Sequence, residues 1–260
     1  MNIYPAFATC PAGKARCHGM GRQEQNMSGI TPPFYEAGGG LYRYPGLARG
    51  VSMMTNALTG GLGTGKTTVL AMFKKLDVLT LSADDLVHEE LKKNKGLQKR
   101  IKDAFGLEVF QKGKIQRQLL ARKVFGRPKD LNKLNTMIHP LVRRRLFQLF
   151  RRYQNKPLMV VEIPLLFETG FDKFFDLTIG VATDLKIQRE RLLKDSRFDL
   201  ESIALRMRRQ LPLDKKIARC DFIIDNSGNR RRTFHQVKKL IELICADNLC
   251  SLSFHKLCAH

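Results

Sequence analysis

The sequence lacks the features of a membrane or secreted protein. No apolar run approaches the length of a membrane-spanning helix. The N-terminal stretch has no continuous apolar segment of the kind that a secretory signal peptide needs. None of the six cysteines forms a C-x-x-C pair. We therefore expect reduced thiols and a cytoplasmic protein.

Acidic residues are also scarce. The chain has 24 Asp and Glu against 46 Lys and Arg, which gives a formal net charge of +22. A charge of this size raises nucleic acid as a partner, but no helix-turn-helix, zinc finger or aromatic-and-basic RNA motif accompanies it. We favour cationic pockets for a small polyanionic substrate. We expect no specific nucleic acid, no membrane partner, and a monomer or weak homo-oligomer.

One stretch carries a complete phosphate-binding motif. Gly60 to Thr68 reads G-G-L-G-T-G-K-T-T and contains G-x-x-x-x-G-K-[ST]. Glycines let a phosphate chain approach the backbone, and successive N–H groups and a helix N-terminus attract its charge. Lys66 can reach the β and γ phosphates, and the Thr67 hydroxyl can bind Mg²⁺. The expected nucleotide-binding residues are Gly61, Gly63, Thr64, Gly65, Lys66, Thr67 and Thr68.

Apolar runs alternate with helical patterns along the rest of the chain. We expect five strands, at 54–58, 78–82, 158–163, 177–181 and 221–225. Helical spacing is found at 69–76, 86–91, 97–105, 114–126, 130–152, 185–211 (with a break near 197–199) and 233–246. This alternation predicts an α/β fold, with a five-stranded parallel sheet covered by helices on both faces. Ligands gather at the carboxyl ends of such strands, where the Gly60 loop, Asp84, Glu162 and Thr183 are expected.

The terminal segments differ from the region between them. Residues 1–52 are rich in Gly, Pro and small residues, without a sustained period. A disordered extension, a targeting peptide and an upstream-extended reading frame all remain open, and we expect a dispensable extension. The folded domain is expected at 53–246, followed by a tail at 247–260.

Two carboxylates follow the second expected strand. Phosphoryl transfer needs one such group to orient and deprotonate the attacking hydroxyl. An Asp before a helix otherwise serves as an N-cap. We assign the catalytic role to Asp84 and the capping role to Asp85.

Several motifs together resemble a known family. They are L-T-G-G-L-G-T-G-K-T-T at 58–68, S-A-D at 82–84, G-K-I-Q-R-Q-L-L-A-R-K-V-F at 113–125, I-H-P-L at 138–141, V-V-E-I-P-L-L-F-E at 160–168, Q-R-E-R-L at 188–192 and D-N-S-G at 225–228. The phosphate loop alone is common to many kinases, whereas the combination in this order is specific. Over roughly 54–245 the chain resembles the dephospho-coenzyme A kinases.

The resemblance implies a reaction and an architecture. ATP, with Mg²⁺, would phosphorylate the ribose 3′-hydroxyl of dephospho-CoA to give coenzyme A, the last step of CoA biosynthesis. The P-loop kinase fold would carry a helical acceptor-binding region at about 86–155 and a lid at about 185–215. The alternatives are another P-loop small-molecule or nucleoside kinase, a nucleic-acid-binding ATPase, and a catalytically weakened relative.

The resemblance also implies roles for residues at matching positions. Asp84 would be the base, Lys66 would hold the phosphates, and Arg191 would stabilise the transferring phosphoryl group from the lid. Asn226 would be a further nucleotide-binding residue, and residues near it would lie close to the adenine or the lid base. The expected substrate-binding residues are His88, Arg117, His139 and Glu162.

Some of these positions keep alternatives or depart from the family. Glu162 could sit beside the metal or pair with a nearby Arg, and His139 could belong only to a helix N-terminal turn. Ser82 stands where the family usually has Asp, and His88 where it usually has Arg. Because Asp84 is retained, we expect activity.

Overall fold

The computed structural model describes residues 53–124, 127–194 and 200–247. These residues form two compact units. Unit 1 combines the chain up to Thr80 with the chain from Asn155 onward, and unit 2 spans Leu81–Gln154. The expectations for residues 1–52, for the helix break near 197–199 and for 248–260 lie outside the described residues.

A five-stranded sheet forms the centre of unit 1. Its strands are β1 (Met54–Gly60), β2 (Leu79–Ser82), β5 (Leu158–Glu162), β6 (Leu177–Ala182) and β7 (Phe222–Asp225). Their order is β2-β5-β1-β6-β7, and β1 pairs in parallel with both β5 and β6. β2 reaches from the end of unit 1 into the start of unit 2. The five predicted strands and the α/β fold are confirmed.

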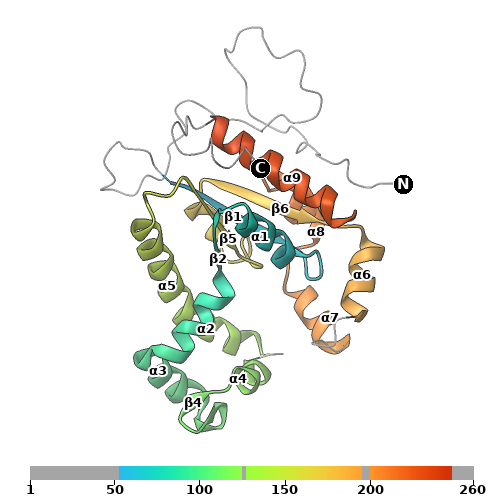
Figure 1. The fold of residues 1–260 in the computed structure, drawn as a ribbon. Coiled ribbons are helices and arrows are strands. Elements are labelled where there is room, and N and C mark those ends of the chain that lie inside the picture. The colour runs from blue at the N-terminus through green and yellow to red at the C-terminus, as the bar shows by residue number, and fades with distance from the viewer. Residues whose placement is uncertain (1–52, 125–126, 195–199, 248–260) are drawn as a thin grey trace, which may run out of the picture. The chain divides into compact units, whose positions relative to one another are not determined.

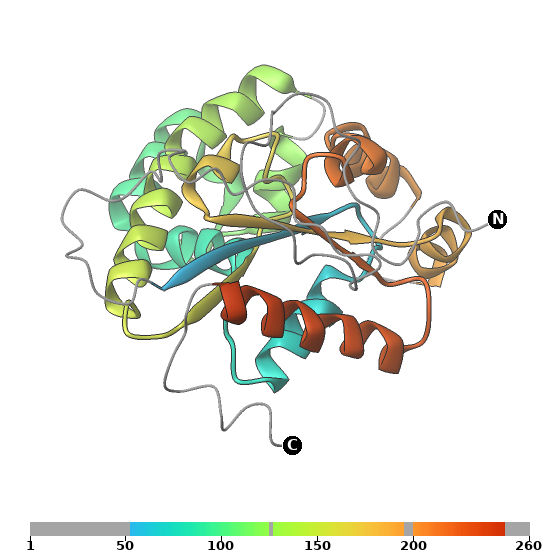
Figure 2. The ribbon, with the colours of Figure 1, turned by 90° about the horizontal axis from the view of Figure 1, so that it is seen from above.

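Helices cover both faces of this sheet because both faces are apolar. Every residue of β1 and β5 is buried, and successive side chains point to opposite faces. On one face, Leu58 and Ile179 share a core with Phe73 of α1 (Lys66–Lys75) and Val237 of α9 (Arg230–Asp247). Figure 2 shows α1 and α9 side by side. On the other face, α8 (Leu213–Ile217) packs Ile217 against β6 and β7.

Three shorter elements complete unit 1. They are η2 (Phe171–Phe174), α6 (Leu185–Lys194) and α7 (Leu200–Arg208). The two helices account for most of the helical pattern expected at 185–211.

Unit 2 is helical and is built around one long helix. Its elements are α2 (Ala83–Lys93), α3 (Lys95–Phe105), η1 (Leu107–Val109), β3 (Phe110–Gln111), β4 (Lys114–Ile115), α4 (Arg117–Val124) and α5 (Pro128–Arg152). α5 packs against α2, α3 and α4, which Figure 1 shows in green. Leu97, Ile101 and Leu146 are almost fully buried, so this unit has a core of its own.

Two element boundaries in unit 2 differ from those expected. The helix expected at 114–126 begins only at Arg117, because Lys114–Ile115 pairs antiparallel with Phe110–Gln111. Lys112 and Gly113, with φ of 47° and 71°, form the two-residue turn between them. Left-handed backbone at both central residues suits a tight hairpin. The helix expected from Leu86 begins earlier, at Ala83.

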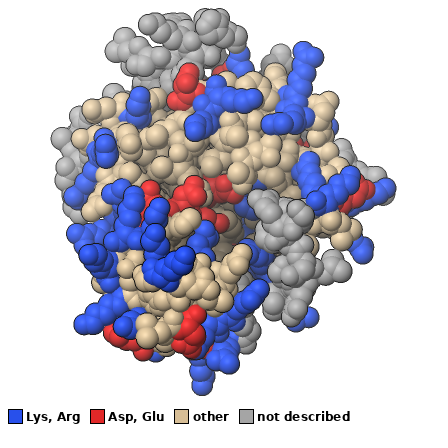
Figure 3. Space-filling view, turned by 60° about the horizontal axis from the view of Figure 1, so that its bottom comes forward, with Lys and Arg blue, Asp and Glu red and all other residues tan. Residues whose placement is uncertain are grey.

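The surface is strongly cationic. Unit 2 alone contains nineteen Lys and Arg against seven Asp and Glu. Figure 3 shows one face of the molecule, on which Lys and Arg are spread widely and Asp and Glu are few. Within the described residues, no helix has the length and apolar character needed to cross a membrane.

Candidate active site

The phosphate loop joins β1 to α1 in the geometry that its motif predicts. Gly63 and Gly65 have φ of 77° and 87°, in the left-handed region that glycine adopts at little cost. Gly65 is the N-cap residue of α1, so the positive end of this helix lies at the loop. Thr64 is fully buried, and its hydroxyl donates to the Gly61 carbonyl at 3.0 Å.

The structure brings Lys66, Thr67 and Glu162 together. Lys66 Nζ donates to the Gly61 carbonyl at 2.8 Å, which holds the ammonium over the loop. Thr67 Oγ1 donates to Glu162 Oε1 at 3.2 Å. Glu162 is only 7% exposed and ends β5, the strand beside β1. The hydroxyl that the motif assigns to the metal therefore lies beside a buried carboxylate, one residue after the lysine that bonds the loop.

Side chains from α6 and from the segment after β7 bond two carbonyl groups of the phosphate loop. Gln188 Nε2 donates to the Leu62 carbonyl at 2.5 Å, and Asn226 Nδ2 donates to the Thr64 carbonyl at 2.8 Å. A Cβ atom placed on Gly63 would meet the Leu192 side chain at 2.8 Å. Gln188 and Leu192 belong to the motif at 188–192, but the sequence predicted no role for either. The usable signal is their spacing with Arg191, since positions three and four apart share a helix face.

Arg191 lies beside the loop, and one of its two terminal guanidinium nitrogens makes a hydrogen bond. Its Nη2 donates to the Asn226 main-chain carbonyl at 2.9 Å. Its Nη1 is buried and has no hydrogen-bond partner within the described residues. A Cβ atom on Gly65 would lie 3.6 Å from this Nη1. An unsatisfied, buried guanidinium N–H at this position fits an anionic group, because such a donor is costly to leave unpaired.

Asn226 is a buried junction of hydrogen bonds. Its side-chain Oδ1 accepts from Thr233 Oγ1 at 3.1 Å, and its main-chain carbonyl accepts from Thr183 Oγ1 at 3.3 Å. Gln236 of α9 bonds both the N–H and the carbonyl of the preceding Asp225, each at 2.9 Å. These bonds hold the end of β7 against α9.

The two carboxylates after β2 belong to unit 2. Asp84 and Asp85 both lie in the first turn of α2, and both are exposed. The N-cap residue is Ser82, which makes no side-chain capping bond. The capping role expected of Asp85 is therefore wrong, because the helix starts two residues earlier than Asp85. Both carboxylates instead lie in the first turn, where a negative charge interacts favourably with the positive end of the helix dipole.

Two expected substrate-binding residues of unit 2 are in contact. Arg117 Nη1 and His88 Nδ1 lie 3.3 Å apart, and both side chains are exposed. A guanidinium can only donate, so His88 Nδ1 is the acceptor in this pair.

His139 lies in the middle of α5, followed by Pro140 within the same helix. The alternative of a helix N-terminal turn is therefore wrong. The side chain is half-buried, and burial lowers the pKa of its imidazole.

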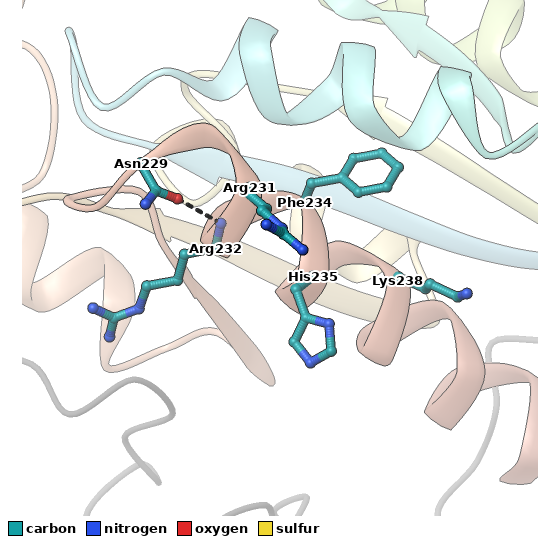
Figure 4. A pocket seen from close by; sticks show the side chains of 6 residues that line it. All are labelled: Asn229, Arg231, Arg232, Phe234, His235 and Lys238. Carbon is teal, nitrogen blue, oxygen red and sulfur yellow. Dashed lines mark hydrogen bonds between the residues drawn. The ribbon is translucent and has the colours of Figure 1, made fainter.

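A cavity of about 450 Å³ lies at the first turns of α9, outside the phosphate loop. Figure 4 shows the side chains of its lining, which are Asn229, Arg231, Arg232, Phe234, His235 and Lys238. Asn229 Oδ1 accepts from the Arg232 N–H at 2.9 Å, as a helix cap does. Its lining is cationic and aromatic, and it lies on α9 rather than at the phosphate loop.

The donor set at the loop suits Mg²⁺ that is held mainly by phosphate oxygens and water. Among the described residues, no three His, Cys, Asp or Glu side chains gather as a protein-only metal centre requires. Mg²⁺ characteristically uses few protein ligands in such sites. The Thr67 hydroxyl, with Glu162 behind it, fits that pattern.

The chain is similar in sequence to curated dephospho-CoA kinases. A curated dephospho-CoA kinase of Syntrophotalea carbinolica is 37% identical over 194 residues, covering 73% of this chain and 91% of that protein. The corresponding enzyme of Wolinella succinogenes is 32% identical over 193 residues, covering 74% and 94%.

Solved structures agree with these relatives. TT1252 from Thermus thermophilus has a TM-score of 0.66 and 30% identity, covering 74% of this chain and 97% of that one. A dephospho-CoA kinase from Campylobacter jejuni has a TM-score of 0.57 and 26% identity, covering 75% and 98%. The family model described as dephospho-CoA kinase matches residues 54–231. With this match added to the loop geometry, the chain belongs to the dephospho-CoA kinase family.

Proposed function

We propose that this protein transfers a phosphoryl group from ATP to the ribose 3′-hydroxyl of dephospho-CoA and so forms coenzyme A, the last step of CoA biosynthesis. The observation that carries the proposal is the cluster of Lys66, Thr67 and Glu162 at a complete phosphate loop, in a chain of this family. Neither the family nor the site favours another P-loop kinase or a nucleic-acid-dependent ATPase.

Unit 1 would bind the donor. The loop N–H groups and Lys66 would hold the phosphates of ATP, with Gly61, Gly63, Thr64 and Gly65 on the backbone side and Thr68 beside Thr67. Mg²⁺, held by Thr67 with Glu162 behind it, would neutralise phosphate charge when bound. Arg191 would direct its unpaired Nη1 to the transferring group. Because the transition state is loose, these residues would act by position and charge.

Unit 2 would bind the acceptor. Asp84, exposed on the first turn of α2, would orient the 3′-hydroxyl and accept its proton. His88 and Arg117 would contact the anionic part of dephospho-CoA, to which their contact and the cationic surface of unit 2 are suited. His139, a half-buried imidazole on α5, would also contact the acceptor.

The wider organisation follows from these roles. Residues 53–246 would form the kinase domain, with the acceptor region at about 86–155 and the lid at about 185–215. Lid closure would exclude water and suppress hydrolysis of ATP. We further propose a cytoplasmic monomer or weak homo-oligomer that has no specific nucleic-acid partner.

The test is a kinase assay with ATP, Mg²⁺ and a panel of dephospho-CoA, adenosine, AMP and gluconate. Dephospho-CoA should be the preferred acceptor by kcat/KM, and ³¹P NMR of the product should show a 3′-phosphomonoester. Preference for another member of the panel, or hydrolysis of ATP without transfer, would contradict the proposal. Replacing Mg²⁺ by excess chelator should stop turnover.

A further inference from the structure

Two buried side-chain amides donate hydrogen bonds to main-chain carbonyls of the phosphate loop. Gln188 of α6 donates to the Leu62 carbonyl, and Asn226, directly after β7, donates to the Thr64 carbonyl. Each of the two side chains is only 5% exposed. Both residues and the loop belong to unit 1.

The orientation of these amides follows from their partners. A main-chain carbonyl can only accept, so the NH₂ groups of Gln188 and Asn226 must face the loop. For Asn226 the opposite end confirms this, because its Oδ1 accepts from the Thr233 hydroxyl. Turning either amide over would set oxygen against oxygen in a buried place, which is unfavourable.

Fixing a carbonyl also fixes the N–H on the other side of the same peptide bond. The peptide unit is planar and trans, so the C=O of one residue and the N–H of the next point in opposite directions. When Leu62 C=O is bonded to Gln188, the Gly63 N–H points away from α6. When Thr64 C=O is bonded to Asn226, the Gly65 N–H points away from the end of β7.

Two glycines of the loop also leave room for these amides. A Cβ atom on Gly65 would come within 2.2 Å of Asn226 Nδ2, and one on Gly61 within 3.1 Å of Gln188 Nε2. The missing side chains therefore let the two amides approach the backbone, in addition to leaving room for a phosphate.

We infer that Gln188 and Asn226 are positioning residues, which aim the Gly63 and Gly65 N–H groups at the phosphates of the nucleotide. In this inference Asn226 acts on the nucleotide through the loop, whereas the family resemblance implies that residues near it lie close to the adenine or the lid base. Donors that are held in place beforehand need no reorganisation when the ligand arrives. The inference rests on the proposed ATP site and adds the residues that shape it.

The test uses the full chain with Gln188→Met and with Asn226→Asp. Gln188→Met keeps the length of the side chain and removes its donor, whereas Asn226→Asp keeps the acceptor for Thr233 and turns an oxygen toward the Thr64 carbonyl. Calorimetry would measure the Kd of ATP and of tripolyphosphate, each with Mg²⁺. Gln188→Met should weaken both ligands by the same factor of about five to ten, the value of one hydrogen bond. Asn226→Asp should weaken both further.

Gln236→Met is the matched control. Gln236 is also a buried amide, 4% exposed, but it bonds the backbone of Asp225 and not the loop. Its loss should lower the melting temperature at least as much as Gln188→Met does. The Kd of both ligands should stay within about twofold of wild type, because Gln236 bonds Asp225 and not the phosphate loop.

Two results would overturn the inference. One is an unchanged Kd for both ligands in Gln188→Met. The other is a loss for ATP with wild-type affinity for tripolyphosphate in Asn226→Asp, which would indicate an adenine contact. If Asn226→Asp does not fold, Gln188→Met decides alone. A wild type that binds tripolyphosphate but does not phosphorylate dephospho-CoA would contradict the proposed function, while the binding data still decide the inference.

Discussion

A buried ion pair in unit 1 allows a sharp prediction about stability. Lys216 of α8 is 0% exposed, and its Nζ lies 3.0 Å from Glu168 Oε1. The same Nζ donates to the Pro164 carbonyl at 2.5 Å, and Glu168 Oε1 also accepts from the Leu211 N–H at 2.7 Å. These bonds tie the segment after β5 to the segment that leads into α8.

Removing one partner should cost much more than removing both. Glu168→Gln leaves the Lys216 ammonium buried without a counter-charge, and breaking a buried pair in this way costs about 3–5 kcal/mol. For a domain of this size that corresponds to a fall in Tm of roughly 6–20 °C. The double variant Glu168→Gln/Lys216→Met buries no charge, so it should be more stable than Glu168→Gln alone.

The assay is urea unfolding of the wild type, both single variants and the double variant, followed by circular dichroism. The double-mutant cycle should give a coupling free energy of about 2 kcal/mol or more between Glu168 and Lys216, at the upper part of the range for contacting residues. A loss below about 1 kcal/mol for Glu168→Gln, the range of an exposed pair, together with additive effects, would refute the reasoning.

The pH dependence provides a second readout. Burial lowers the pKa of Lys216, although the hydrogen bond and charge of Glu168 oppose this. Between the lowered pKa and about 10.4, the value in the unfolded chain, the unfolded state binds more protons than the folded state. Stability should therefore rise with pH in that window. Lys216→Met should remove this rise, measured as Tm against pH.

Three further predictions concern the site and unit 2. Lys66→Ala should abolish measurable turnover and weaken ATP binding, because a charge on the β and γ phosphates is lost; near-normal kcat in steady-state assays would exclude the loop as the donor site. Asp84→Asn should lower kcat by about 10²–10⁴ with little change in the calorimetric Kd of ATP, while Asp85→Asn should cost far less. The reverse ranking would show that the base is misassigned by one position. Burial lowers the pKa of His139 in the folded state below about 6.5, its value in the unfolded chain. As the pH falls below about 6.5, the unfolded state therefore binds more protons than the folded state, and the free energy of unfolding decreases. His139→Asn should flatten this acid-side loss in Tm, and an unchanged profile would contradict a cost from charging the buried ring.

The sequence was most informative where the signal is local. The strand, glycine loop and helix around Lys66 are contiguous, so the motif predicts both their structure and their ligand. The central strands β1 and β5 were predictable because a buried parallel strand reads as a short apolar run. The resemblance to the family likewise rests on contiguous motifs, and the family model confirms it.

Weak local signals account for the errors in unit 2. β3 and β4 have two residues each, too few to show a period of two. At the start of α2, both Ser82 and the Asp residues that follow favour a helix N-terminus, so the residue types alone do not select Ala83 as the first residue.

Only the tertiary structure decided what the polar side chains contact. Asn226 lies 162 positions from Thr64, and Gln188 lies 126 positions from Leu62. Both amides nevertheless donate hydrogen bonds to carbonyls of the phosphate loop. Lys216 follows Asp214 and Lys215, and in the sequence it resembles a residue on a solvated face. It is buried because the fold brings Glu168 and the Pro164 carbonyl to its Nζ. Local pattern determines which segments form helices and strands, whereas the role of an amide or a charge depends on partners that only packing brings within hydrogen-bond distance.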